Sequence, residues 1–283
     1  MARIIDPHLH LFNLEQGCYG WLRPENPPFW PDKGNINRSF SEQNLRLPEG
    51  IELAGFVHIE AGFDNQAPWR ELAWLETHCN LPFRSVAYAD LQAEIFRQQI
   101  SHLQRYPSLT GIRYILEANP QELLAQAQAI GSLAYLAEQN LLFEAQFSLA
   151  DLRAVAALEK ILIQHPDLCV VINHAGFPTE NAPLWRQGVE RLSGYPNCAV
   201  KCSGWEMADR HWRVTDVQRY IDYLLAQWGN DRVMLASNFP VSELACSYSA
   251  LWQSYMETLS YSAEQKQALT FANAQRIYQV PVT

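Results

Sequence analysis

Strand-like and helix-like runs alternate along most of this chain of 283 residues. Short apolar runs are each followed by a longer stretch whose apolar residues recur at helical spacing. The expected strands are residues 2–5, 53–59, 85–88, 109–115, 141–147, 168–174, 198–203 and 233–237. Because such alternation predicts parallel strands, eight units predict an α/β fold, a closed (β/α)8 TIM barrel. We expect a single domain over residues 1–283, since such barrels commonly take about 250 residues.

The helical stretches between these strands complete the pattern. They are expected at residues 69–78, 91–105, 120–139, 149–165, 182–193, 216–228, 244–259 and 264–278. A doubly wound open sheet is the alternative arrangement of the same elements. It requires a glycine-rich phosphate loop after the first strand, and Asp6-Pro7-His8-Leu9-His10 stands there instead.

A long irregular segment, residues 11–40, follows the first strand. It is rich in Gly, Pro, Asn and Trp, and includes Trp21 and Trp30. Loops of this length inside a compact domain are uncommon and are usually functional or disordered. The aromatic content favours a long, folded loop that covers the end of the barrel.

The two histidines at the end of the first strand suggest a site. Side chains alternate between the faces of a strand, so Asp6, His8 and His10 are expected on one face. Imidazole is the commonest protein ligand for metals, and two on one face can share an ion. The plain alternative is a surface accident near a terminus. The apolar residues on both sides favour a metal or catalytic role.

Composition limits the classes of molecule that this chain is expected to bind. The formal net charge of −9 argues against nucleic acid or an anionic membrane, and no apolar run is long enough to span a bilayer. The six cysteines form no Cys-x-x-Cys pair, which indicates reduced, buried thiols. We see no signal-peptide pattern and expect a cytoplasmic protein with a small-molecule substrate. Whether it forms a homo-oligomer is left open.

Polar residues gather at the predicted strand ends, where catalytic groups of such barrels lie. They are His58 and Glu60 on the second strand, Arg113 on the fourth, Glu144 and Gln146 on the fifth, Asn173 and His174 on the sixth, Lys201 and Ser203 on the seventh, and Asn238 after the eighth.

These motifs resemble those of the amidohydrolase superfamily. The resemblance rests on Asp-x-His-x-His after the first strand, Asn173-His174-Ala175-Gly176, Lys201-Cys202-Ser203-Gly204 and Ser237-Asn238-Phe239-Pro240. It covers nearly the whole chain. The most similar subgroup is amidohydrolase 2, which includes sugar-acid lactonases such as L-fuconolactonase, pyrone-dicarboxylate lactonase and metal-dependent decarboxylases.

The resemblance implies roles for individual residues. His8, His10 and His174 match metal ligands, and His174 alternatively polarises the scissile carbonyl. Asn238 stands where the family usually has the aspartate that accepts a proton from the attacking water. An amide cannot accept that proton as a carboxylate does. Glu60, Glu144 and His174 are the candidates for a substitute base.

Other side chains are expected to bind the substrate. They are His58, Arg113, Gln146, Lys201, Trp205 and Trp30, with the tryptophans stacking on a sugar-like ring. Arg113 alternatively forms a buried ion pair with Glu144, and Lys201 is alternatively paired near the barrel mouth. The family places its metal-bridging lysine on strand four, which here carries Arg113, so a two-metal site is not expected.

The resemblance therefore implies a hydrolase that opens the ring ester of a sugar acid or related small lactone, with His174 and Asn238 at its centre. One divalent ion, zinc or manganese, is expected, or else a metal-free mechanism. The rival hypotheses are a metal-dependent decarboxylase of the same architecture and a barrel that binds a small ligand without turnover.

Overall fold

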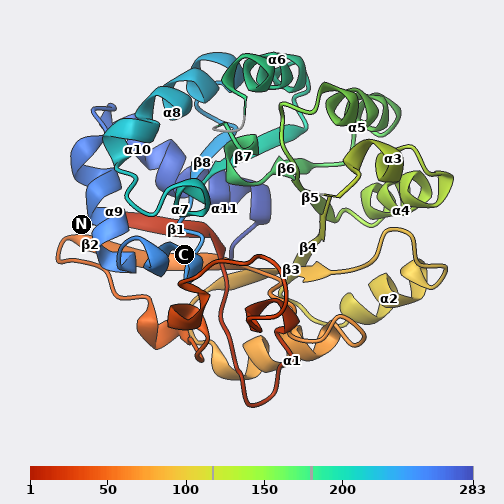
Figure 1. Ribbon diagram of the computed structural model, residues 1–283, viewed down its shortest axis with the longest axis horizontal. Helices are drawn as coiled ribbons and strands as arrows, with labels where there is room; N and C mark the ends of the chain where they lie inside the picture. Colours follow the sequence, from red (N-terminus) through yellow and green to blue (C-terminus); the bar gives the residue numbers. More distant parts are fainter. Residues whose placement is uncertain (117, 179–180, 283) are drawn as a thin grey trace.

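Eight parallel strands form the barrel in a computed structural model, which describes residues 1–116, 118–178 and 181–282 (Figure 1). Neighbours in the sheet are neighbours in sequence, from the first strand to the eighth. The strands are β1 (Ala2–Leu9), β2 (Ile51–Ile59), β3 (Phe83–Tyr88), β4 (Leu109–Ile115), β5 (Leu142–Gln146), β6 (Val170–Ile172), β7 (Cys198–Cys202) and β8 (Val233–Leu235). The predicted (β/α)8 TIM barrel is confirmed.

Helices surround the sheet, as Figure 1 shows. They are α1 (Trp69–His78), α2 (Phe96–Leu103), α3 (Pro120–Leu124), α4 (Ala127–Glu138), α5 (Leu152–Gln164), α6 (Ala182–Ser193), α7 (Trp205–Ala208), α8 (Val214–Trp228), α9 (Tyr248–Thr258), α10 (Ala263–Gln267) and α11 (Asn273–Tyr278). Two helices begin at capping side chains. Asp151 accepts hydrogen bonds from backbone amides in the first turn of α5, and Ser247 accepts one from the first turn of α9. In the described part of the chain, no helix is long and apolar enough to cross a membrane.

Three predicted helices were wrong in their extent. The stretch 120–139 is two helices, because Gln126 takes an extended conformation between α3 and α4. The stretch 91–105 is helical only over α2, after a turn. The stretch 264–278 includes a π-helical turn, Ala268–Ala272, between α10 and α11. Apolar periodicity alone does not report such interruptions.

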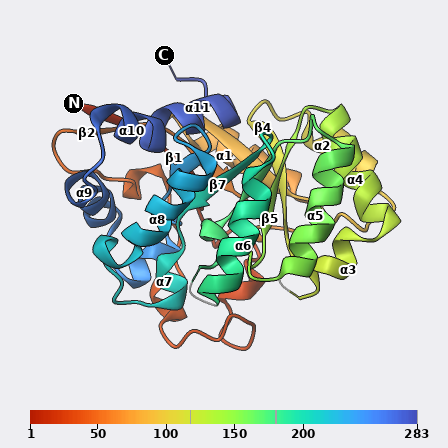
Figure 2. The same ribbon diagram turned by 90° about the horizontal axis from the view of Figure 1, so that it is seen from above.

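The amino-terminal end of the barrel is filled by apolar side chains. Inward-facing residues of the strands pack there against Phe271 and Tyr278 from the C-terminal segment. Figure 2 shows α10 and α11 at this end and α7 with the loop after β1 at the opposite end. The floor is therefore closed, and the carboxyl ends of the strands are left for a site.

Strands β1 and β8 meet through backbone hydrogen bonds beside the predicted histidines. The His10 amide donates to the Phe239 carbonyl at 2.6 Å, and the Asn238 amide donates to the His8 carbonyl at 2.8 Å. The Asp6 carboxylate also accepts from the Ser237 amide at 3.1 Å. The closure of the barrel thus places His8 and His10 next to Asn238.

The long loop after β1 is folded, as predicted. The Lys33 ammonium donates to the carbonyl oxygens of Trp21, Arg23 and Asn26 at 2.7–2.9 Å. The Trp21 indole donates to the Ala61 carbonyl at 2.8 Å, which fixes the loop to the segment after β2. Satisfied backbone carbonyls and buried rings give this loop a defined shape over the barrel.

Candidate active site

Three imidazole rings lie side by side at the carboxyl end of the barrel. The ring of His8 is 5.1 Å from that of His10 and 4.7 Å from that of His174, between centroids. His8 and His10 come from the end of β1, and His174 follows β6. Residues 164 positions apart in sequence, His10 and His174, are thus brought to one place by the barrel.

His174 stands on an unusual backbone. Its φ is 53°, and Ala175 and Phe177 beside it have φ values of 52° and 56°. Non-glycine residues in the left-handed region are uncommon, and such strain gathers at functional sites. Gly204 allows the arrangement, since a β-carbon there would lie 2.5 Å from Nδ1 of His174. The segments after β6 and β7 therefore leave space for the imidazole of His174 and fix its position.

The three imidazoles are neutral at neutral pH. Burial is the main cause that lowers the pKa of each ring well below the ordinary value. The positive charge of Lys201 adds to the effect on His8 and His174, and that of Arg113 acts on all three. Neutral rings offer one N–H donor and one lone pair each.

Hydrogen bonds constrain two of these rings. The Nδ1–H of His10 donates to the Ile59 carbonyl at 2.8 Å, so its Nε2 carries the lone pair in the neutral ring. Nδ1 of His174 lies 3.0 Å from the Ser203 hydroxyl oxygen. Both nitrogens of His8 are buried without a hydrogen-bond partner among the residues that the structure describes. A buried imidazole without a partner in the fold indicates that a bound ligand supplies the missing contact.

The donor set does not fit a preformed metal site. Over residues 1–116, 118–178 and 181–282, no three His, Cys, Asp or Glu side chains are arranged to hold an ion together. His8, His10 and His174 lie close together, but in the described part of the chain they are not arranged as the three converging protein ligands that zinc sites normally need. Asn238 places a neutral amide where a carboxylate would offer an anionic donor beside the imidazoles.

Arg113 on β4 lies in the same end of the barrel. Its Nε donates to the Glu60 carboxylate at 2.8 Å, and its Nη1 donates to the Gln146 amide oxygen at 3.3 Å. The expected alternative pair, Arg113 with Glu144, was wrong. Arg113 and Gln146 are buried next to each other, and the Glu60 carboxylate is held in an ion pair with Arg113.

Lys201 lies beneath the imidazoles rather than at the mouth. Its ammonium donates to the Glu144 carboxylate at 2.6 Å, and the Tyr278 hydroxyl donates to the other oxygen at 2.6 Å. Lys201 and Glu144 are completely buried. Burial lowers the pKa of Lys201 to about 8, and Glu144 opposes this shift. These contacts make Lys201 a structural charge and leave Glu144 no free oxygen for proton transfer.

His58 faces the helix layer, although its ring centroid lies 6.5 Å from that of His10. Its Nε2 lies 3.0 Å from the Glu71 carboxylate of α1, and its Nδ1 accepts from the Leu11 amide at 3.2 Å. Both ring nitrogens are therefore used within the fold. The structure does not support the predicted substrate contact, and His58 is left out of the proposed site.

A second carboxylate, which the sequence reading missed, lies beside Asn238. Glu206 lies in the first turn of α7, and the Asn238 Nδ2 donates to its Oε1 at 2.5 Å. Both side chains are buried. Burial raises the pKa of Glu206 to about 7. The only signal in the sequence was an acidic residue directly after Lys201-Cys202-Ser203-Gly204-Trp205, without any sign of its partner.

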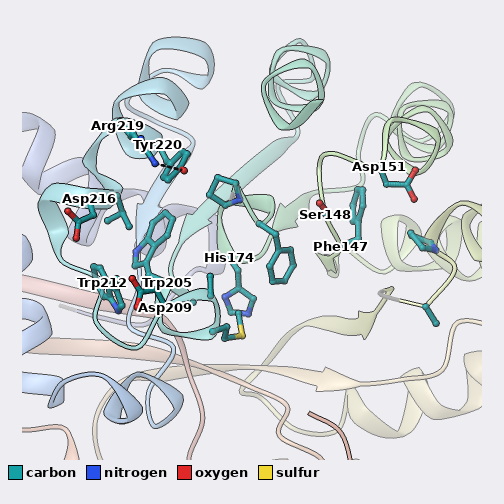
Figure 3. A pocket seen from close by; sticks show the side chains of 18 of the residues that line it. Phe147, Ser148, Asp151, His174, Trp205, Asp209, Trp212, Asp216, Arg219 and Tyr220 are labelled. Atoms are coloured by element: carbon teal, nitrogen blue, oxygen red, sulfur yellow. Dashed lines mark hydrogen bonds between the residues drawn. The ribbon is translucent and has the colours of Figure 1, made fainter. Parts of the chain in front are cut away.

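A cavity of about 900 Å³ opens above His174. Figure 3 shows His174 between Trp205 and Phe147, with Trp212 and Tyr220 farther out. Trp30 of the long loop and Trp205 both line it, whereas His58 does not. The volume falls in the range of small-molecule sites. Aromatic rings line it together with polar and charged side chains, among them Asp151, Arg153 and Arg219.

Comparison with known proteins agrees with this arrangement. The family model described as "Amidohydrolase" matches residues 5–280. The chain belongs to the amidohydrolase family. It is 29% identical over 295 residues to protein y4mH of Sinorhizobium fredii, which covers 98% of both chains. It is 26% identical over 304 residues to an L-fucono-1,5-lactonase of Burkholderia multivorans, with 98% of this chain and 96% of that protein covered.

A solved structure extends the comparison to the fold. An amidohydrolase from Burkholderia multivorans with bound zinc has a TM-score of 0.77 and 22% sequence identity. The match covers 99% of this chain and all of the other. At this identity the likeness concerns the barrel. As an amidohydrolase, this chain carries its polar residues at the strand ends from which such barrels act.

Proposed function

We propose that this amidohydrolase is a lactonase, which hydrolyses the ring ester of a sugar acid or a related small lactone. The observation that carries the proposal is His174, a buried neutral imidazole that lines a cavity with both aromatic and polar side chains. The L-fucono-1,5-lactonase relative, aligned over nearly the whole chain, supports this class of substrate.

His174 is proposed to stabilise the negative charge that develops on the carbonyl oxygen. With Nδ1 accepting from the Ser203 hydroxyl, the neutral ring carries its proton on Nε2. That N–H then donates to the oxyanion. A neutral donor suits this task because its low pKa keeps it from becoming a permanent charge, and positioned donors contribute strongly in buried sites.

Hydrolysis of the ring needs only water as a second reactant. The water oxygen bonds to the carbonyl carbon, and the bond from that carbon to the ring oxygen breaks. One proton of the attacking water passes to the ring oxygen, which becomes a hydroxyl, so the product is an open hydroxy acid. Asn238 and Arg113 are proposed to orient the water and the substrate oxygens in this step, since both lie by the imidazoles.

A divalent ion, zinc or manganese, stays a prediction from the resemblance. It would polarise the carbonyl or activate the water if bound. Because the described donors do not converge, the chain's own side chains are proposed to perform these tasks. Trp30 and Trp205 are proposed to stack on the lactone ring, as both line the cavity.

A panel of aldonolactones with a pH indicator tests the proposal. Hydrolysis releases acid, so a colour change above the uncatalysed rate is the expected result for at least one member. The zinc and manganese content of the same preparation is measured. Its activity is measured again after dialysis against a chelator. Absence of turnover over the whole panel, with either ion added, would remove the lactonase proposal.

The ion pair between the long loop and the loop after α7 is expected to affect substrate binding. Arg210 donates to the Asp32 carboxylate at 2.8 Å and lies over the Trp30 ring. Asp32→Asn should raise KM about 2–5-fold and leave kcat within about twofold, because partly exposed ion pairs contribute about 0.2–1 kcal/mol. Steady-state kinetics on a lactone measures both constants.

The matched control is Glu159→Gln, which removes a comparable pair with Arg191 on the outer helices. It should leave both constants unchanged. A tenfold fall in kcat with unchanged KM for Asp32→Asn would contradict a binding role for this pair.

A further inference from the structure

A carboxylate and an amide face each other at the end of β8. Glu206 comes from α7 and Asn238 from the turn after β8, and the amide Nδ2 donates to Glu206 Oε1 at 2.5 Å. Glu206 is 1% exposed and Asn238 is 2% exposed. A buried carboxylate is costly unless it is paired or hydrogen-bonded. The Asn238 amide supplies such a hydrogen bond to Glu206, so the two side chains are coupled in the folded protein.

The chemistry of the pair fixes the orientation of the amide. An ionised carboxylate only accepts hydrogen bonds, so the NH₂ group of Asn238 must face Glu206. The amide oxygen then faces the other way. Asn238 lies beside the histidines, since its backbone amide donates to the His8 carbonyl at 2.8 Å. The oxygen is therefore turned to the imidazole cluster.

We propose that Glu206 is a positioning residue of the reaction, which holds the Asn238 amide with its oxygen turned to the imidazoles to accept a hydrogen bond from the attacking water. This inference rests on the proposed hydrolysis. It also gives a role to Asn238 that needs no proton uptake by the amide. Glu60 and Glu144 cannot replace Glu206, because their carboxylates are held by Arg113 and Lys201.

The groups around Glu206 determine the pH range in which it orients the Asn238 amide. Burial is the largest cause that raises its pKa to about 7, and the Asn238 hydrogen bond and Arg210 oppose it. Cys246 and Tyr255 also face this charge, and both keep their protons at neutral pH because burial raises the pKa of each. A protonated Glu206 donates as well as accepts, so the amide loses its fixed orientation as the pH falls through about 7.

The substitution Glu206→Gln separates orientation from size. Glutamine fills the same volume but both donates and accepts, so it does not impose one orientation on Asn238. We expect kcat to fall about 10-fold, equivalent to about 1.4 kcal/mol, with KM within about twofold. The acid limb of the kcat profile, centred near pH 7, should disappear. Glu206→Asp should recover part of kcat, and Glu159→Gln should behave as the wild type.

Exchanging the two groups gives a second test. Asn238→Asp alone places two carboxylates in contact, which must share a proton, so kcat should fall below that of Glu206→Gln. The double variant Asn238→Asp/Glu206→Gln restores one carboxylate and one amide. Its kcat should be at least about 10-fold higher than that of Asn238→Asp. A pair with only a structural role would not couple the two substitutions in kcat.

Nuclear magnetic resonance of the Asn238 side chain reports on the pair without a substrate. In protein labelled with ¹⁵N-asparagine, the NH₂ resonances lost in Asn238→Asp identify this residue. Their shifts should titrate with a midpoint near pH 7 in the wild type and not in Glu206→Gln. If they titrate while no lactone is turned over, the orientation by Glu206 stands and the proposed function fails. Resonances that do not titrate, or a Glu206→Gln variant with wild-type kcat, would overturn the inference.

Discussion

Replacing His174 by alanine is expected to lower kcat about 10²–10³-fold, the loss found when one donor to an oxyanion is removed. The imidazole lines the cavity, is neutral, and is held by Ser203 and by the backbone after β6. If its N–H acts only on the charge of the transition state, KM should change little. Steady-state kinetics on the best lactone of the panel gives both constants.

Two further variants make the result specific. Ser203→Ala removes the hydrogen bond to Nδ1 but leaves the imidazole, so we expect a smaller loss than in His174→Ala. His211→Ala replaces an exposed histidine that does not line the cavity and should have the wild-type kcat. Equal activity of His174→Ala and wild type, with both folded by circular dichroism, would exclude His174 as the oxyanion donor.

Lys201→Met is expected to destabilise the protein by about 3–5 kcal/mol, because it removes one partner of a completely buried ion pair. Glu144 then keeps only the Tyr278 hydroxyl as a donor. The unpaired Glu144 carboxylate lowers the stability by more than the ion pair contributed, because a buried ion needs a partner. Urea unfolding followed by circular dichroism measures the free energy of unfolding.

The double variant Lys201→Met/Glu144→Gln removes both charges and is the matched control. It should recover much of the lost stability, because an uncharged amide can accept from Tyr278 without an ionic partner. If Lys201→Met unfolds within about 1 kcal/mol of the wild type, Lys201 does not neutralise Glu144 in the folded protein.

The barrel and half of the site could be predicted from the sequence. Eight apolar runs at regular spacing are enough to predict parallel strands, and polar residues at their carboxyl ends must then meet at one end. This argument correctly brought His8, His10, His174 and Arg113 together. It needs no knowledge of which residue contacts which.

Partners in space could not be predicted. Strands of a parallel barrel are buried on both faces, so their apolar pattern does not tell inside from outside. His58 therefore looked like a site residue, although it faces Glu71 in the helix layer. The contact between Glu206 and Asn238 joins residues 32 positions apart through tertiary packing, which no local pattern reports.

Hydrolysis in ¹⁸O-labelled water tests the central claim most directly. The best lactone of the panel is incubated with the wild-type enzyme, and the product is examined by mass spectrometry. Attack of water on the carbonyl carbon predicts a hydroxy acid that carries one ¹⁸O atom in its carboxyl group, formed faster than with His174→Ala. Loss of carbon dioxide from the substrate, or unchanged lactone at all enzyme concentrations, would contradict the claim.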